Sequence, residues 1–290
     1  MITVFTPTYN RCYIIDSLYQ SLLRQTNKDF EWIVVDDGST DDTEAYFNTI
    51  LKNDTPFKIL YKKQKNGGKH RALNVGVTLA TGDLFFIVDS DDYLTDDAIE
   101  KVYKWKLTLD NSHKWAGVSG ARGFTIDKHI GGIYNKKGFV DCKNNQRSKF
   151  NLYGDKAEVY FTDVLRKYPF PEFEGENFIT EEVVWNAIAI DGYYLRWYSD
   201  IIYICDYLED GLTKNSTKNK KNPQGVLAWY KIQLKAFPHN IKKKASAVCA
   251  YYDAVCETKN IKSVATDLGV SVLYIKLALK VRDVFYSNTK

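Results

Sequence analysis

The chain has 290 residues, of which 44% are hydrophobic, and its formal net charge is +4. Its five cysteines are odd in number and include no Cys-x-x-Cys pair, which argues against a zinc site and against a disulfide framework. No apolar stretch approaches the length of a membrane span, and the first residues lack the pattern of a signal peptide. We therefore expect a cytoplasmic protein, either soluble or peripheral at the inner face of the membrane.

Charge is distributed unevenly along the chain. Residues 213–290 carry fifteen Lys and Arg against four Asp and Glu, a net charge of +11, which leaves −7 for residues 1–212. Such asymmetry suggests two parts with different roles. We expect a large domain over residues 1–213, a polar linker over 214–223 and a basic helical region over 224–290.

The first hundred residues alternate between short apolar runs and segments with helical spacing. The expected strands are 2–6, 30–35, 57–61 and 84–88, and the expected helices are 14–24, 43–51, 71–80 and 96–109. This alternation predicts an α/β fold with a mainly parallel sheet flanked by helices. Further along, we expect a Gly-rich irregular region at 115–163 with strand-like pieces such as Ala116–Ser119. A helix at 180–190, a strand at 193–205 and helices at 224–236, 241–258 and 270–286 are expected to follow.

Four polar clusters follow the predicted strands, at 6–11, 36–42, 66–70 and 89–92. In open α/β sheets, ligands bind outside the carboxyl ends of the strands. Because all four clusters follow strand ends, we expect them to converge on one edge of the sheet.

The last cluster places three carboxylates, Asp89, Asp91 and Asp92, within four residues. Their mutual repulsion favours a bound cation, and Mg²⁺ or Mn²⁺ commonly takes one or two carboxylates together with phosphate oxygens. The alternative is an acidic loop before a helix, since Asp favours turns and first helical turns.

Two other clusters suggest nucleotide contacts. Asp37, after the second strand, could accept a hydrogen bond from a base N–H or a ribose hydroxyl, whereas Ser39–Asp42 suit a simple turn and helix cap. The segment 66–71 reads Asn-Gly-Gly-Lys-His-Arg and could present backbone N–H groups and cations to phosphate. It contains neither a P-loop nor a Gly-x-Gly-x-x-Gly pattern, and Asn-Gly is also a common turn.

Glu181 and Glu182 open an apolar helix that contains Trp185. Two acids at a helix start usually complement the helix dipole. One of them could instead serve as a general base, with Trp185 as the apolar wall that tunes its pKa.

Together these segments resemble the inverting family 2 glycosyltransferases, which have the GT-A fold with a Rossmann-like sheet. The resemblance covers about residues 1–210, and its motifs are Thr6–Arg11, Val34–Asp41, Asn66–Lys69 with Ala72–Gly76, and Asp89–Asp92.

The resemblance implies roles for single residues. Pro7, Tyr9 and Arg11 would line the nucleotide pocket, Asp37 would pair with the base, expected to be uracil, and Lys69 would approach the phosphates. Asp91 would be the main ligand of Mn²⁺ or Mg²⁺, and Asp89 would lie near the ribose or the metal. Further donor or acceptor contacts would come from Asn66, Gly68, Asp92, Trp185 and Lys214, the last of these in a stretch, Tyr207–Lys214, similar to members that build surface polysaccharides.

The catalytic base of the family usually lies in a Glu-Asp pair, which here is Glu181-Glu182. We expect Glu182 to be the base and Glu181 to face the metal, the donor or the acceptor. The implied reaction is metal-assisted direct displacement, with inversion, from a nucleotide-sugar donor, expected to be a UDP-sugar. The acceptor would be a hydroxyl of a saccharide, a glycolipid or a cell-surface polymer.

Two other functional classes fit the sequence less well. A nucleotidyltransferase would typically carry a loop rich in Gly, Arg and Lys after the first strand, which Thr6–Asn10 lacks. Residues 261–275 look somewhat like a helix-turn-helix, but Val272–Leu279 is mostly Leu, Ile, Tyr and Ala rather than base-reading polar residues. We therefore expect no nucleic-acid partner.

The segment Val270–Tyr286 is apolar over most of its surface, with Lys276, Lys280 and Asp283 on one narrow face. It could lie in the plane of an anionic membrane, or it could pack on the large domain or on a second subunit as a homo-oligomer contact. The periodicity serves both interpretations.

Overall fold

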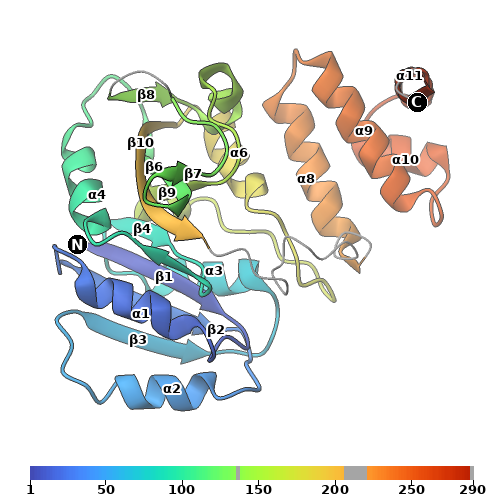
Figure 1. Ribbon diagram of the computed structural model, residues 1–290. Coiled ribbons are helices and arrows are strands. Elements are labelled where there is room, and N and C mark those ends of the chain that lie inside the picture. The colour runs from blue at the N-terminus through green and yellow to red at the C-terminus, as the bar shows by residue number, and fades with distance from the viewer. Residues whose placement is uncertain (135–137, 206–220, 288–290) are drawn as a thin grey trace.

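The computed structural model describes residues 1–134, 138–205 and 221–287 (Figure 1). Its strands are β1 (Ile2–Thr8), β2 (Phe30–Asp36), β3 (Lys58–Lys63), β4 (Leu84–Ile87), β5 (Asp92–Leu94), β6 (Trp115–Thr125), β7 (Lys128–His129), β8 (Phe139–Cys142), β9 (Lys156–Phe161) and β10 (Tyr194–Cys205). The α-helices are α1 (Ile15–Arg24), α2 (Thr43–Ile50), α3 (Lys69–Leu79), α4 (Ala98–Leu107), α5 (Thr162–Leu165), α6 (Glu182–Ile190), α8 (Pro223–Ala236), α9 (Ile241–Val255), α10 (Ile261–Leu268) and α11 (Val272–Ser287). Every helix and strand expected over the first hundred residues is present, with ends that differ by a few residues.

One mixed sheet runs through the α/β part, in the order β3-β2-β1-β4-β9-β6-β10-β5. The pairs β2–β3, β1–β2 and β1–β4 are parallel, whereas β9 is antiparallel to both β4 and β6. Every residue of β1 and β2 is buried, as expected for parallel strands covered on both faces. The fold is thus α/β with a mainly parallel first half.

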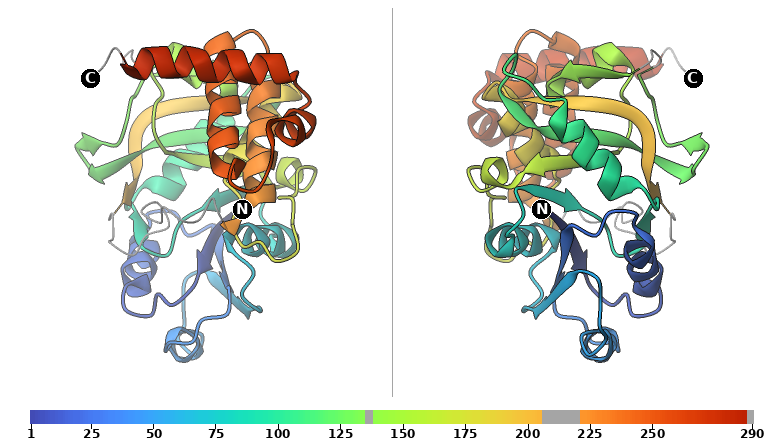
Figure 2. Two further views of the ribbon diagram at one scale, coloured as in Figure 1. Left: turned by 90° about the vertical axis from the view of Figure 1, so that its right-hand side faces the viewer. Right: turned by 90° about the vertical axis from the view of Figure 1, so that its left-hand side faces the viewer.

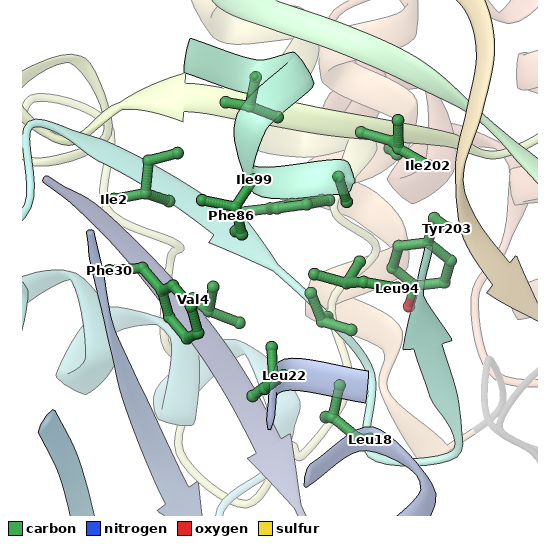
Figure 3. Close-up of a cluster of buried hydrophobic side chains, with 14 of the residues drawn as sticks. Ile2, Val4, Leu18, Leu22, Phe30, Phe86, Leu94, Ile99, Ile202 and Tyr203 are labelled. Atoms are coloured by element: carbon green, nitrogen blue, oxygen red, sulfur yellow. The ribbon is translucent and has the colours of Figure 1, made fainter. Parts of the chain in front are cut away.

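Two apolar layers cover the faces of this sheet. On one face, helices α1, α2 and α4 pack on β1, β2 and β4 through side chains such as Leu18, Leu22 and Ile99 (Figure 3). On the other face, α3 and α6 contribute Leu73, Val184 and their neighbours. Helices on both faces leave the strand ends as the place for polar groups.

The carboxyl ends of β1, β2 and β3 are in register. Thr8 pairs with Asp36, and Asp36 pairs with Lys63. The loops that follow these strands therefore begin at the same level of the sheet. Because β4 is also parallel to β1, with Ile87 beside Phe5, the polar clusters after all four strands lie along one edge.

The region 115–163 is more regular than the sequence indicates. It was expected to be irregular apart from short strand-like pieces such as Ala116–Ser119, but it contains β6, β7, β8 and β9. Strand β6 continues through several small residues because they fit against neighbouring strands; a Cβ on Gly117 would lie 2.0 Å from the Val159 carbonyl oxygen. Small residues that suggest loops can thus mark close strand packing.

The C-terminal helices α8 to α11 share an apolar cluster of their own, and α8 also packs on α6 (Figures 1 and 2). Helix α8 begins at Pro223, one residue before the expected start of this region. Most of the expected linker lies outside the described residues. The division into a domain over 1–213, a linker and a C-terminal region stays a prediction.

Helix α11 begins at Val272, after Gly269 ends α10 with a positive φ of 67°. Ile275 and Ala278 of α11 are buried, whereas Leu273, Leu277 and Val281 are exposed. Among the described residues, no helix is long and apolar enough to cross a membrane. Attachment of α11 to a membrane surface or to a second copy stays a prediction.

Candidate active site

The loops after β1 and β2 are joined by hydrogen bonds at the sheet edge. The Asn10 backbone N–H donates to Ser39 Oγ at 2.8 Å, and Asn10 Oδ1 accepts from the Thr40 backbone N–H at 2.8 Å. Asn10 adopts a φ of 53°, a conformation that Asn tolerates better than most residues. These contacts make the two loops one continuous surface.

Asp37 binds the loop that precedes α3. Its Oδ1 accepts from the Gly67 N–H at 2.9 Å and from Gln64 Nε2 at 2.8 Å, and its Oδ2 accepts from the Gly68 N–H at 2.7 Å. Three of roughly four acceptor positions of this carboxylate are therefore used within the protein. The base contact implied for Asp37 stays a prediction, and the structure adds a role in shaping the Gly-Gly loop.

Lys69, the first residue of α3, lies between two carboxylates. Its Nζ is 2.6 Å from Asp89 Oδ1 and 2.8 Å from Glu181 Oε1. Burial opposes the charge of Lys69, but Asp89 and Glu181 together raise its pKa above the ordinary value. Lys69 thus joins the loop before α3, the acidic run Asp89–Asp92 and the start of α6.

Two residues that the sequence did not single out organise the acidic run. The Tyr203 hydroxyl accepts from the Asp89 N–H at 2.9 Å and donates to Asp92 Oδ2 at 2.7 Å. Arg122 packs over the Tyr203 ring at 4.1 Å and is 3.8 Å from Asp89 and 3.9 Å from Asp92. Burial, followed by the charge of Asp89, raises the pKa of Asp92 to about 7. Asp92 is therefore buried and is held in place by Tyr203 and Arg122.

Asp91 differs from its two neighbours. It is partly exposed, and it forms no ion pair with the described residues. Burial, followed by the charge of Asp89, raises its pKa above the ordinary value. The described residues contain no group of three or more His, Cys, Asp and Glu side chains that could hold a metal ion. One carboxylate fits a Mg²⁺ or Mn²⁺ ion whose other ligands come from a bound diphosphate, so the donor set at Asp91 is compatible with that kind of site.

The two acids at the start of α6 point to different partners. Glu181 forms an ion pair with Lys69, which also pairs with Asp89. Glu182 Oε2 instead accepts from Trp229 Nε1 at 2.5 Å and from Gln233 Nε2 at 2.9 Å, both on α8. Glu181 therefore faces Lys69 and Asp89 whereas Glu182 faces α8, and the assignment of the base to Glu182 stays a prediction.

Other expected site residues take varied positions. Pro7 is buried in β1, and Tyr9, directly after β1, is 47% exposed. Arg11 Nη1 donates to the Tyr13 hydroxyl at 3.1 Å. The positive charge of Arg11 favours the charged form of Asp91 and so acts to lower the pKa of that carboxyl. Trp185 stacks on Tyr160 at 4.3 Å within the core, and its expected role as the wall beside a base stays a prediction.

The Gly-Gly loop also contacts the segment before α6. Asn66 is exposed, whereas a Cβ on Gly68 would lie 1.9 Å from the Asn177 carbonyl oxygen, so Gly68 serves close packing as well as any donor contact. Lys214 lies outside the described residues.

The geometry also explains which site residues the sequence could not indicate. Arg122 and Tyr203 belong to strands β6 and β10 and reach the acidic run through the sheet order, far along the chain from it. Nothing in the local sequence marks either residue. Only knowledge that β10 pairs with β5, which carries Asp92, would have identified Tyr203.

Comparison with known proteins matches this architecture. Residues 3–167, more than half of the chain, match the model of Glycosyl transferase family 2. Glycosyltransferase GlyG of Streptococcus pneumoniae is 35% identical over 104 residues, which are 36% of this chain and 34% of GlyG. A second relative, the GalNAc(5)-diNAcBac-PP-undecaprenol beta-1,3-glucosyltransferase of Campylobacter jejuni, is 26% identical over 224 residues, 75% of this chain and 69% of that protein. The chain thus spans only about a third of the length of GlyG.

Solved structures share the fold. S. aureus TarS 1–349 in complex with UDP-GlcNAc superposes with a TM-score of 0.66 at 18% identity, covering 90% of this chain and 76% of TarS 1–349. Mannosyltransferase PcManGT from Pyrobaculum calidifontis, in complex with GDP-Man and Mn2+, gives a TM-score of 0.53 at 17% identity, covering 98% and 86%. The fold is of the GT-A type, and the chain belongs to glycosyl transferase family 2.

Proposed function

We propose that the protein transfers a sugar from a nucleotide-sugar donor, a UDP-sugar, to a hydroxyl of a saccharide or lipid-linked acceptor, with inversion. The observation that carries this proposal is the position of Lys69 Nζ, 2.6 Å from Asp89 and 2.8 Å from Glu181, at the edge where the loops after the strands meet. A cation that can bind phosphate and a candidate base are thereby held together, beside the acidic run that contains Asp91.

The donor would bind across the loops after β1, β2 and β3. Asp37 orients the Gly67–Gly68 turn, and Lys69 follows directly as the first residue of α3. A helix start with a nearby cation suits the negative charge of a diphosphate. We propose that the diphosphate takes over Lys69 and releases the Glu181 carboxylate from its ion pair.

Glu181 would then act as the general base. A carboxylate within hydrogen-bond reach of an acceptor hydroxyl can remove its proton as the oxygen attacks the anomeric carbon. One displacement step of this kind inverts the configuration at that carbon. Glu182 is less suited to this role because its Oε2 already accepts two hydrogen bonds from α8.

Asp91 would hold Mn²⁺ or Mg²⁺ together with the diphosphate oxygens. When bound, such an ion neutralises the charge that develops on the departing nucleotide diphosphate. Asp89 is paired with Lys69 and Arg122 in the structure and is therefore less free than Asp91 to act as the main ligand.

The relatives support the substrate classes. TarS 1–349 was crystallised with UDP-GlcNAc and with UDP, and the name of the Campylobacter relative describes glucose transfer to an undecaprenol-linked saccharide. PcManGT carries GDP-Man and Mn2+, which makes a GDP-sugar the first donor to compare.

A donor screen tests the proposal. The protein would be incubated with UDP-, GDP- and dTDP-sugars, with and without Mn²⁺, while thermal shift and release of the nucleotide diphosphate are measured. We expect stabilisation and slow release with UDP-sugars and Mn²⁺. Neither stabilisation nor release with any nucleotide sugar would refute the proposed function.

A further inference from the structure

Residues 176–182, the segment that carries Glu181, are attached at their beginning to the first turn of α8. The Glu176 carboxylate, only 7% exposed, accepts from the backbone N–H groups of Gln224 and Gly225 at 2.7 and 2.8 Å. These donors belong to the first turn of α8, whose N–H groups have no partner within the helix. Asn222, just before α8, accepts in turn from the backbone N–H groups of Asn177 and Phe178 at 2.8 and 3.0 Å.

The same segment is attached to α8 again directly after Glu181. Trp229 and Gln233 lie one helical turn apart on α8, and both donate to Glu182 Oε2. Helices α6 and α8 also pack against each other, as Figure 1 shows. Helix α8 therefore holds residues 176–182 on both sides of Glu181.

The opposite side of this segment faces the loop between β3 and α3, residues 64–68, which we call the donor loop. Arg71 donates to the carbonyl oxygens of Gly67, Phe173 and Glu176, each at 2.7 Å. Asn177 leaves no room for a side chain at Gly68. A displacement of the segment away from α8 would thus be transmitted to both Glu181 and the Gly67–Gly68 turn.

We infer that α8 is a positioning element of the active site, in which Trp229 and Gln233 act through Glu182, and the start of α8 acts through Glu176, to hold Glu181 at the site. This inference rests on the proposed function and extends it beyond residues 3–167, the part that matches the family model. Trp229 and Gln233 are positioning residues, because they contact Glu182 and not Lys69 or Asp89.

The test is the double variant Trp229→Phe/Gln233→Leu, which keeps apolar contacts and removes both donors to Glu182. Small displacements of a reacting group can lower a rate by up to about 100-fold, so we expect kcat for UDP release from the active UDP-sugar to fall on the order of tenfold. KM for the donor should change by less than about twofold, since the donor loop keeps its Arg71 contacts.

Three matched variants separate positioning from general damage. Glu182→Ala should lower kcat as the double variant does. Glu182→Gln, whose side-chain oxygen can still accept from both donors, should keep most of the wild-type kcat. Trp115→Phe removes an indole donor of similar geometry, 2.7 Å from the Asp110 carbonyl oxygen and away from the site, and should leave kcat unchanged.

Hydrogen exchange of the first-turn amides of α6 gives a readout that does not need turnover. We expect faster exchange there in the double variant and not in Trp115→Phe. Unchanged exchange would refute the structural coupling, and faster exchange with unchanged kcat would refute its role in catalysis. If the wild-type protein releases nucleotide from no donor, the proposed function fails and the catalytic role of α8 fails with it, a result distinct from an active wild type with insensitive variants.

Discussion

The substitution Asp37→Asn tests how the donor loop is built, because it removes one charge and changes little else. In the structure, Asp37 Oδ1 accepts two hydrogen bonds and Oδ2 accepts a third, from the Gly68 N–H at 2.7 Å. The amide of Asn offers a single oxygen. In the better orientation it keeps the Gly67 and Gln64 bonds and turns its NH₂ group towards the Gly68 N–H.

The energetic cost follows from this count. A hydrogen bond to a charged group contributes about 1.5–3 kcal/mol and a neutral one about 1 kcal/mol, so one lost bond and two weakened bonds sum to at least about 2.5 kcal/mol, and we take about 3 kcal/mol from the lower end of this range. Asp37 is only 5% exposed, so water cannot readily take the place of the carboxylate oxygen. The free energy of unfolding should therefore fall by about 3 kcal/mol.

Asp41→Asn is the matched control. Asp41 also accepts three hydrogen bonds, from the Cys12 N–H and from the N–H and hydroxyl of Thr43, but it is exposed, so its loss should cost less than about 1 kcal/mol. Urea unfolding would measure both variants, and calorimetry with UDP and Mn²⁺ would measure the dissociation constant. We expect UDP affinity to fall on the order of tenfold in Asp37→Asn. Full stability with full UDP affinity would contradict the proposed role of this carboxylate in the loop.

Three further predictions concern charge. Lys69→Met should weaken UDP binding by about 10–100-fold in calorimetry, because a charge-assisted contact to phosphate is lost; unchanged binding would exclude Lys69 from the diphosphate site. Asp91→Asn, or EDTA added to the wild type, should abolish UDP release, and full turnover in EDTA would refute the metal assignment. Burial lowers the pKa of Lys156 to about 8. Between about pH 8 and about pH 10.5, the folded state therefore binds fewer protons than the unfolded state, so the free energy of unfolding rises with pH over this range. Stability of the wild type relative to Lys156→Met should therefore increase by about 3 kcal/mol over this range in urea unfolding, and a decrease would contradict the assignment.

The sequence predicted the first half of the fold well because parallel strands and their helices carry local signals. Continuous apolar runs such as Trp32–Val35 and amphipathic helices such as Ile15–Arg24 depend on few distant contacts. The convergence of the polar clusters followed from the general rule for parallel sheets. Strand β6 was largely missed because its glycines, favourable for packing against β9, resemble those of loops.

The candidate site was predictable in its motifs and not in its contacts. Lys69, Asp89 and Glu181 were all singled out, but their association depends on how α6 is placed against α3. The choice between Glu181 and Glu182 as the base depends on side-chain direction, which adjacent positions in a motif cannot decide. The direction is set by Trp229 and Gln233, about fifty residues further along the chain.

The pair Glu181→Gln and Glu182→Gln tests the central claim most directly. Each variant removes one charge from adjacent residues, so each controls for the other, and both would be measured for UDP binding and for transfer or hydrolysis of the active donor. If Glu181 is the base, Glu181→Gln should keep UDP binding and lose about 100–10,000-fold in kcat, while Glu182→Gln should keep most of its activity. Loss of activity in Glu182→Gln together with an active Glu181→Gln would contradict the account.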